Sequence, residues 1–266
     1  PSIWADAHAA ASVTMTKRTK LLAVALVAAI LIGIVAVIAW VGLGGGQSAA
    51  LPQAETALVP DDDVAVQMEP WITLTPSELA ETGFILYPGA RVDPAAYAPS
   101  ARAIADQGYL TVIVPMPFGI AALGAEQAND VMEAFPEVDR WVIGGHSLGG
   151  AMAVQYTDEN VVRIDGVALW GAYPSPDEDI STEPVLVLSV YASEDGLSTV
   201  EEIEDTAQYL PGETEFVLIE GGNHTNFGLY ETQDGDGVAT IPPAEQQSQT
   251  VAATLDLLEA VEAAGT

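Results

Sequence analysis

From Trp71 onward, short apolar runs alternate with longer stretches in which apolar residues recur at helical spacing. The apolar runs are rich in Val and Ile, which is typical of parallel strands that are buried on both faces of a sheet. We predict strands at 84–87, 110–114, 141–143, 166–170, 185–190 and 216–219, with a further edge strand at 72–74. We predict helices at 94–107, 125–135, 148–156, 200–210 and 243–263. This alternation predicts an α/β fold with a doubly wound, mostly parallel sheet.

A different pattern precedes this domain. The segment Leu21–Val41 is an unbroken apolar run of 21 residues, long enough for a helix to cross a bilayer core of about 30 Å. Lys17, Arg18 and Lys20 stand directly before the run, and the next cation in the chain is Arg91. The positive-inside rule therefore keeps the N-terminus in the cytoplasm and carries the domain across the membrane. A cleaved signal sequence is the alternative to an uncleaved anchor.

The expected organisation has four parts. Residues 1–20 form a short cytoplasmic tail, of which 1–14 can lie upstream of a natural start at Met15. Residues 21–43 form one N-terminal transmembrane helix or a signal sequence, 44–68 a linker without periodicity, and 69–266 the α/β domain. We expect the protein at the cell membrane with an extracytoplasmic domain, or secreted if the N-terminal segment is cleaved.

The charge of the chain is strongly one-sided, with 38 acidic against 7 basic residues and a net charge of −31. Such a surface repels the phosphates of nucleic acids, so a nucleic-acid partner is excluded. It also leads to the hypothesis of a salty habitat, where repulsion between carboxylates is screened within about 10 Å or less. A generic acidic exported protein is the alternative. The absence of cysteine excludes disulfides, thiolate metal sites and a cysteine nucleophile.

The segment Trp141–Gly150 carries the pattern G-x-S-x-G, as Gly145, Ser147 and Gly149. An apolar strand pattern runs directly into it and a helix pattern runs directly out of it. A strand-to-helix turn this sharp places the serine in strained dihedrals and leaves no room for side chains two residues to either side, which explains the glycines. We therefore predict that Ser147 is a nucleophile held at the N-terminus of a helix.

A serine nucleophile needs a base, and the chain has three histidines. His8 precedes the apolar segment and His146 lies inside the serine turn, which leaves His224, directly after the last predicted strand. The expected acid is Asp195, which follows the strand at 185–190, and Glu194 is its rival. The chain order of serine, acid and histidine agrees with a serine nucleophile on a strand-to-helix turn of an α/β sheet.

Two backbone N–H groups are needed to stabilise a developing oxyanion. We expect them from Leu148, directly after the nucleophile, and from Ala90 in the turn that follows the strand at 84–87. Arg91 stands beside this turn and is a candidate to bind a substrate carboxylate, with an ion pair to a nearby acid as the alternative. No cofactor motif or metal cluster is present, and acyl transfer requires neither. Asp234–Gly237 is predicted to be a turn rather than a calcium loop.

Together these residues resemble the α/β-hydrolase superfamily, over about residue 72 to the C-terminus. The resemblance is greatest to its small, lid-less branch of dienelactone-hydrolase-like proteins and uncharacterised bacterial hydrolases. Its marks beyond the triad are Tyr87–Val92, Asn223-His224 with Phe227-Gly228, and Gly235–Gly237. Dienelactone hydrolases carry a cysteine where this chain has Ser147. The resemblance implies the hydrolase fold, the triad roles and hydrolysis of a carboxylic ester or related acyl bond.

The segment 171–184 has room for no helical cap, so we expect an open site and a small-molecule acyl substrate. The sequence thus predicts a carboxylesterase-like serine hydrolase displayed outside a membrane. Two alternatives stay open: an inactive surface domain that uses the fold for binding, and an acyltransferase or peptidase with the same triad. The sequence does not give the oligomeric state.

Overall fold

The computed structural model describes residues 47–78 and 81–264. The predicted membrane segment 21–43 and the tail 1–20 lie outside the described residues. Among the helices that the structure describes, none combines the length and apolarity that crossing a membrane requires.

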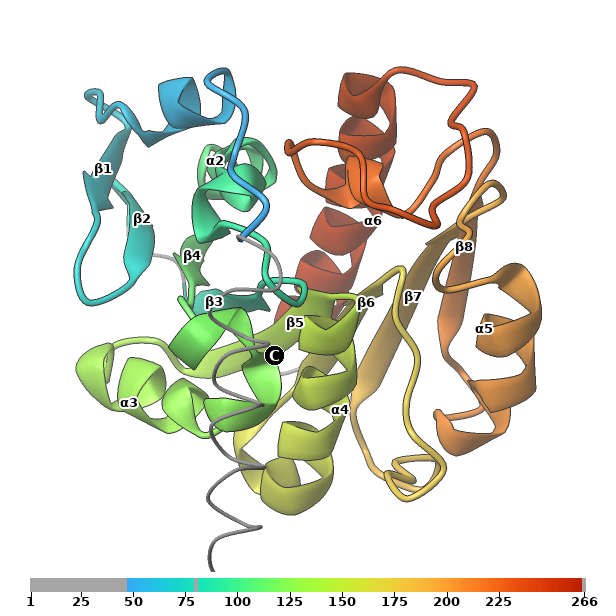
Figure 1. The fold of residues 1–266 in the computed structure, drawn as a ribbon. Coiled ribbons are helices and arrows are strands. Elements are labelled where there is room, and N and C mark those ends of the chain that lie inside the picture. Colours follow the sequence, from blue (N-terminus) through green and yellow to red (C-terminus); the bar gives the residue numbers. More distant parts are fainter. Residues whose placement is uncertain (1–46, 79–80, 265–266) are drawn as a thin grey trace, which may run out of the picture. The chain divides into compact units, whose positions relative to one another are not determined.

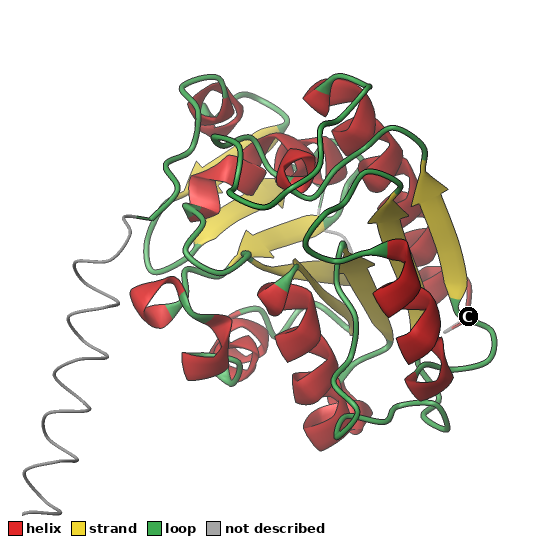
Figure 2. Ribbon diagram, turned by 45° about the vertical axis from the view of Figure 1, so that its right-hand side comes forward, coloured by secondary structure: helices red, strands yellow, loops and turns green. Residues whose placement is uncertain are grey.

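An eight-stranded sheet forms the centre of the folded unit (Figure 2). Its strands are β1 Val64–Gln67, β2 Ile72–Pro76, β3 Thr82–Tyr87, β4 Leu110–Ile113, β5 Arg140–His146, β6 Gly166–Trp170, β7 Leu186–Ala192 and β8 Glu215–Ile219. They lie in the order β1-β2-β4-β3-β5-β6-β7-β8. The two edge pairings β1–β2 and β2–β4 are antiparallel, and all pairings from β4 to β8 are parallel. The mostly parallel sheet predicted from the apolar runs is confirmed.

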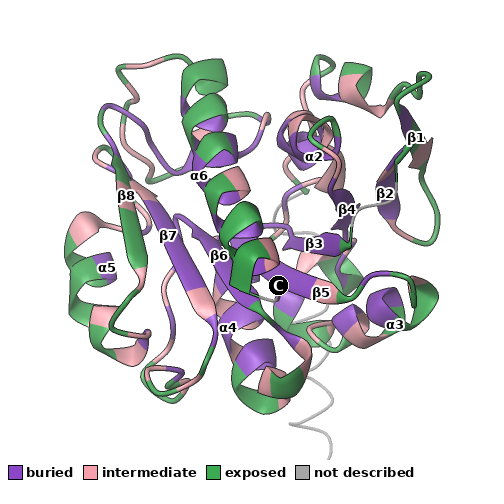
Figure 3. Ribbon diagram, turned by 180° about the vertical axis from the view of Figure 1, so that it is seen from behind, coloured by how far each residue is buried: buried purple, intermediate pink, exposed green. Residues whose placement is uncertain are grey.

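Helices cover both faces of this sheet (Figures 1 and 3). They are α2 Ala98–Ala105, α3 Gln127–Ala134, α4 Leu148–Asn160, α5 Val200–Thr206 and α6 Pro243–Ala264. One apolar core packs α2 and α6 against one face, with Ile104 and Leu258 fully buried. A second core packs α3 and α4 against the other face, with Val131 and Val154 fully buried. Two cores on opposite faces are what a doubly wound sheet requires, because both sides of its strands are apolar.

The segment expected to be a linker differs from the prediction. From residue 47 on, it belongs to the folded unit: Ala54–Leu58 forms a 3-10 helix and β1 adds an edge strand to the sheet. Isolated bridges join Ser48 to Val92 and Ala50 to Tyr230. The pattern hid this structure because β1 has four residues, of which only Val64 is fully buried. Such a short, one-sided edge strand has almost no periodicity to detect.

The parallel strands bring their carboxyl ends to one edge of the sheet. Ser147 follows β5, the Gly89–Arg91 turn follows β3, Asp195 follows β7 and His224 follows β8. The connection between β6 and β7 contains no helix, in agreement with the predicted lack of a cap. The candidate residues are therefore gathered at the edge where ligands bind in α/β sheets.

Candidate active site

Ser147 sits on the turn between β5 and α4, with φ 54° and ψ −126°. Few non-glycine residues adopt such dihedrals, and they persist only where the surroundings enforce them. Here the Ser147 N–H donates to the Trp170 carbonyl at 3.0 Å, which ties the turn to the neighbouring strand β6. The strained serine turn predicted from the G-x-S-x-G pattern is present.

The glycines of the motif are required by contacts within this turn. A Cβ added to Gly145 would lie 2.4 Å from the carbonyl carbon of Gly149. A Cβ added to Gly149 would lie 2.2 Å from the Tyr87 carbonyl oxygen and 2.5 Å from that of Pro88. The first turn of α4 therefore packs directly against the end of β3, so the serine turn and the predicted oxyanion turn are in contact.

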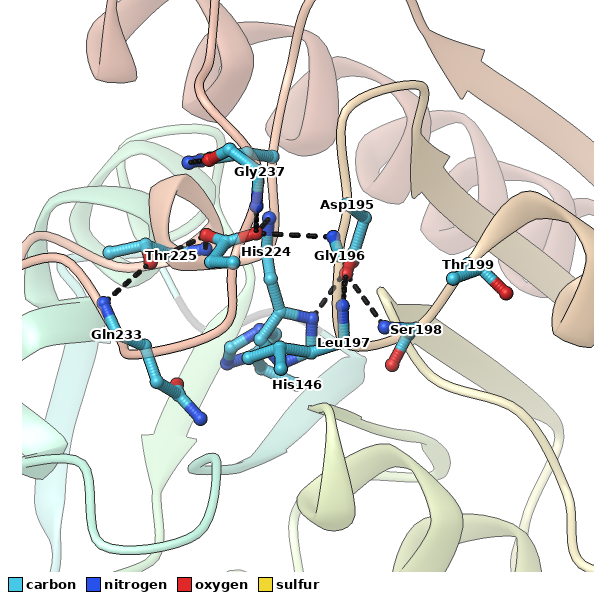
Figure 4. A network of polar contacts seen from close by, with 12 residues as sticks. His146, Asp195, Gly196, Leu197, Ser198, Thr199, His224, Thr225, Gln233 and Gly237 are labelled. Atoms are coloured by element: carbon cyan, nitrogen blue, oxygen red, sulfur yellow. Dashed lines mark hydrogen bonds and ion pairs between the residues drawn. The ribbon is translucent and has the colours of Figure 1, made fainter.

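His224 and Asp195 form a buried pair (Figure 4). His224 Nδ1 lies 2.8 Å from Asp195 Oδ2, and both side chains are almost completely buried. The other carboxylate oxygen, Asp195 Oδ1, accepts the backbone N–H groups of Leu197 and Ser198 at 2.8 and 2.7 Å. Of the two acids left open by the sequence, it is Asp195 that contacts the histidine, whereas Glu194 is exposed and accepts a hydrogen bond from Ser193.

A second carboxylate, Asp236, connects the two loops that carry this pair. Its Oδ1 accepts the N–H groups of His224, Gly237 and Gly196 at 3.1, 2.8 and 3.3 Å. Its Oδ2 accepts the N–H and hydroxyl groups of Thr225 at 2.8 and 2.7 Å. Asp234 and Gly235 form a turn, and Asp236, directly after it, fixes the backbone on either side of the Asp195–His224 contact.

His146 is part of the same cluster. Its ring centroid lies 4.4 Å from that of His224, and its Nδ1 lies 2.8 Å from the Tyr97 hydroxyl oxygen. The same hydroxyl accepts the Gly89 N–H at 2.9 Å. Burial lowers the pKa of His146 well below its usual value and raises the pKa of Tyr97, so both groups are neutral. The Tyr97 hydroxyl and His146 Nδ1 therefore share a hydrogen bond between two neutral groups, and its direction is set by the tautomer of the imidazole.

The hydrogen bonds of the predicted oxyanion turn show which of its backbone N–H groups are free to bind an oxyanion. Gly89 N–H is taken by Tyr97, and Arg91 N–H donates to the Gly119 carbonyl at 2.7 Å. The Ala90 N–H makes no hydrogen bond within the described part of the chain, and Ala90 is exposed. Leu148 is the first residue of α4, where an N–H has no partner inside the helix. The two predicted donors thus lie at available backbone positions of contacting turns.

The Ser147 hydroxyl and the Arg91 side chain complete the predicted site. Within the described residues no hydrogen bond joins Ser147 Oγ to His224; the ring of His146, the residue directly before the serine, contacts the ring of His224. Catalytic hydrogen bonds are often long before substrate binds, so the pairing of Ser147 with His224 stays a prediction. The role of the Arg91 side chain also stays a prediction. Its backbone has a φ of 60°, its N–H donates to the Gly119 carbonyl, and its carbonyl accepts the Ser48 N–H.

The comparison with known families matches the model of the alpha/beta hydrolase family to residues 83–248, which is more than half of the chain. The protein belongs to the alpha/beta hydrolase family. Hydrolysis is therefore its class of activity. Among curated proteins no match was found.

Two solved structures resemble this α/β hydrolase. A predicted CIB-like hydrolase from Thermoplasma acidophilum superimposes with a TM-score of 0.55 at 17% identity, over 73% of this chain and 100% of that one. The esterase domain of a Rhodothermus marinus protein gives a TM-score of 0.49 at 16% identity, over 58% of this chain and 83% of that one. At such identities the likeness to the first structure concerns the fold, because one fold hosts many activities.

Proposed function

We propose that this α/β hydrolase cleaves a carboxylic ester or a related acyl bond through an acyl-enzyme on Ser147. The observation that carries the proposal is the buried Asp195–His224 contact of 2.8 Å, gathered with the strained serine turn at one edge of the sheet. A carboxylate on Nδ1 holds the imidazole with Nε2 free to accept a proton, which is the arrangement that activates a serine hydroxyl.

The proposed reaction uses the groups in turn. His224 Nε2 takes the proton of the Ser147 hydroxyl while Oγ attacks the carbonyl carbon of the substrate. The carbonyl oxygen becomes an oxyanion that accepts the Leu148 and Ala90 N–H groups, each worth about 3–4 kcal/mol of the barrier. When the carbon–oxygen bond of the ester breaks, the leaving alcohol receives the proton from His224. Water, deprotonated by His224, then releases the acid and restores Ser147.

We expect the active site to be open. We also expect the enzyme to act on the extracytoplasmic side of a membrane. The lack of a helix between β6 and β7 supports an open site, which suits small acyl substrates. Display on the extracytoplasmic side is part of the proposal and rests on the apolar run of residues 21–41 and its preceding cations.

A fluorophosphonate probe tests the nucleophile directly. We expect the full-length protein to be labelled and the Ser147→Ala variant not to be labelled, because the probe reacts with an activated serine. His224→Gln should slow labelling by several orders of magnitude, since the base is lost. The same proteins should hydrolyse p-nitrophenyl esters in the same order of rates. Labelling that persists in Ser147→Ala would refute the proposal, and no labelling of the wild type would favour a binding domain.

A further inference from the structure

A cavity of about 290 Å³ lies where the loops after β3 and β4 meet. Its walls include Gln47, Pro88, Gly89, Val92, Met116 and Phe118. Among the described residues that line it none has an ionisable side chain, in a protein with 38 acidic residues. A lining without charge, to which apolar side chains such as Val92, Met116 and Phe118 contribute, suits a neutral group with apolar surface, because burying a charge there would be costly.

The cavity shares a wall with the proposed oxyanion turn. Pro88 and Gly89 line it, and Ala90 follows them directly. The close approach of Gly149 to the Pro88 carbonyl places the start of α4 against this same wall. A larger cavity of about 590 Å³ lies instead at the C-terminal end of α2, around Arg102 and Gly108, where β4 is about to begin. That is the opposite edge of the sheet from the serine turn.

The order of strands indicates which part of an ester would enter the smaller cavity. β3 and β4 lie on one side of β5, and β8, which leads to His224, lies on the other. His224 must protonate the leaving alcohol, so the alcohol has to lie toward the histidine. The acyl group on the opposite side of the scissile bond then extends toward β3 and β4, where the cavity is.

Phe118 is held at this cavity in an unfavourable state. Its side chain is 78% exposed, and its φ of 56° is strained for a residue other than glycine. The loop is fixed in this form because Gly119 N–H donates to Met116 and Gly119 C=O accepts from Arg91. A strained backbone of this kind persists only where its surroundings enforce it and is typical of ligand-binding loops, which favours a role for Phe118 in contacting a ligand.

We propose that this cavity is the acyl-binding subsite and that Phe118 is a specificity-determining residue that packs against a neutral, apolar acyl group. The inference rests on the proposed esterase function and names its substrate class. Pockets for drug-sized ligands measure about 300–1,000 Å³, so a cavity of 290 Å³ suits an acyl group of medium size, such as hexanoyl or benzoyl. Arg91 is not among the residues that line it.

The test compares kcat/KM for p-nitrophenyl acetate and p-nitrophenyl hexanoate, which share a leaving group, using the full-length protein. Phe118→Ala should lower the ratio of hexanoate to acetate activity about tenfold, since loss of an apolar contact is felt by the longer acyl group. Leu123→Ala is the matched control, because Leu123 is 59% exposed in the same loop and does not line the cavity. We expect it to leave the ratio unchanged.

Phe118→Gly separates selectivity from folding. Glycine accepts a positive φ, so this variant should unfold at a higher temperature than Phe118→Ala while losing the same selectivity for hexanoate. One outcome overturns the acyl subsite and leaves the esterase function standing. In it, Ser147 is labelled and acetate is cleaved, but both Phe118 variants keep the wild-type ratio of hexanoate to acetate activity. If the wild type cleaves neither ester and Ser147 is not labelled, the proposed function fails and the subsite fails with it.

Discussion

Replacing Asp236 tests whether a carboxylate outside the proposed triad holds the triad in place. Its two oxygens accept five hydrogen bonds, three through Oδ1 and two through Oδ2. In Asp236→Asn one oxygen becomes an NH₂ group, which cannot accept the N–H groups that face it. With the NH₂ group at the Oδ1 position three N–H groups lose their acceptor; at the Oδ2 position the Thr225 N–H loses its acceptor, whereas the Thr225 hydroxyl can turn and accept instead.

The expected loss of stability follows from these bonds. A hydrogen bond to a charged group contributes about 1.5–3 kcal/mol. Asp236 is half-buried, which favours the lower value, so the loss of one bond in the less costly orientation should reduce the free energy of unfolding by about 1.5 kcal/mol. Asp234→Asn is the control, since it removes the same charge from an exposed position two residues away in the same turn. A surface change of this kind should cost less than about 0.5 kcal/mol.

The effect on catalysis is separate from the effect on folding. Asp236 binds the backbone N–H of His224 and of Gly196, directly after Asp195, so its loss should shift both partners of the pair. A displacement of about 1 Å can cost about 100-fold in rate. We expect kcat for p-nitrophenyl acetate to fall about 10–100-fold in Asp236→Asn, with KM nearly unchanged, at a temperature where urea titration shows the variant folded. If stability falls but kcat equals that of Asp234→Asn, the positioning role is wrong.

Three further predictions follow from the contacts and charges. Gly149→Ala should destabilise the fold by about 3 kcal/mol and slow fluorophosphonate labelling, because the added Cβ would lie 2.2 Å from the Tyr87 carbonyl oxygen. Gly212→Ala is the control: its Cβ would meet no atom within 4 Å, so this variant should unfold at the wild-type temperature. Burial lowers the pKa of His146, so stability should be full above about pH 6.5 and should fall as pH drops below it, because the unfolded chain then binds a proton that the folded protein does not. Urea titrations from pH 8 to 5 should show a smaller fall in His146→Gln, and equal slopes would contradict this account. With a net charge of −31, the unfolding temperature should rise between 0.1 and 2 M NaCl; no rise would remove the hypothesis of a salty habitat.

The sheet could be predicted from the sequence because its strands are buried on both faces. Each predicted strand is present, and β5 is longer than its predicted core because Gly144, Gly145 and His146 continue the strand into the serine turn. The helix predicted at 200–210 is divided into α5 and a 3-10 helix at Ala207–Tyr209. The structure of residues 47–67 could not be predicted, because single bridges and a short edge strand leave no periodic pattern of apolar residues in the sequence.

The candidate site was only partly predictable. Ser147, Asp195 and His224 could be chosen because a local motif and the order of strands restrict them. The bridge from Tyr97 to His146 joins residues 49 positions apart, and Asp236 contacts a backbone N–H 12 positions away. A tyrosine at a helix start and an aspartate in a Gly-rich turn have many ordinary explanations, so no local pattern distinguishes these two. Their roles depend on how loops from different strands cross.

Strained backbone conformations also gather at the carboxyl edge of the sheet, where the candidate site lies. Within the described residues, Arg91, Phe118 and Ser147 are the non-glycine residues with positive φ, and they follow β3, β4 and β5. Each such conformation costs about 1–3 kcal/mol, and the buried strands beneath must offset it. If strain were incidental, it would be scattered over the loops at both edges. Its concentration on three adjacent strands indicates that the geometry of this edge is maintained at the expense of stability, which is expected of a catalytic surface. The sequence conceals it, because Arg, Phe and Ser carry none of the signal that glycine would give at these positions.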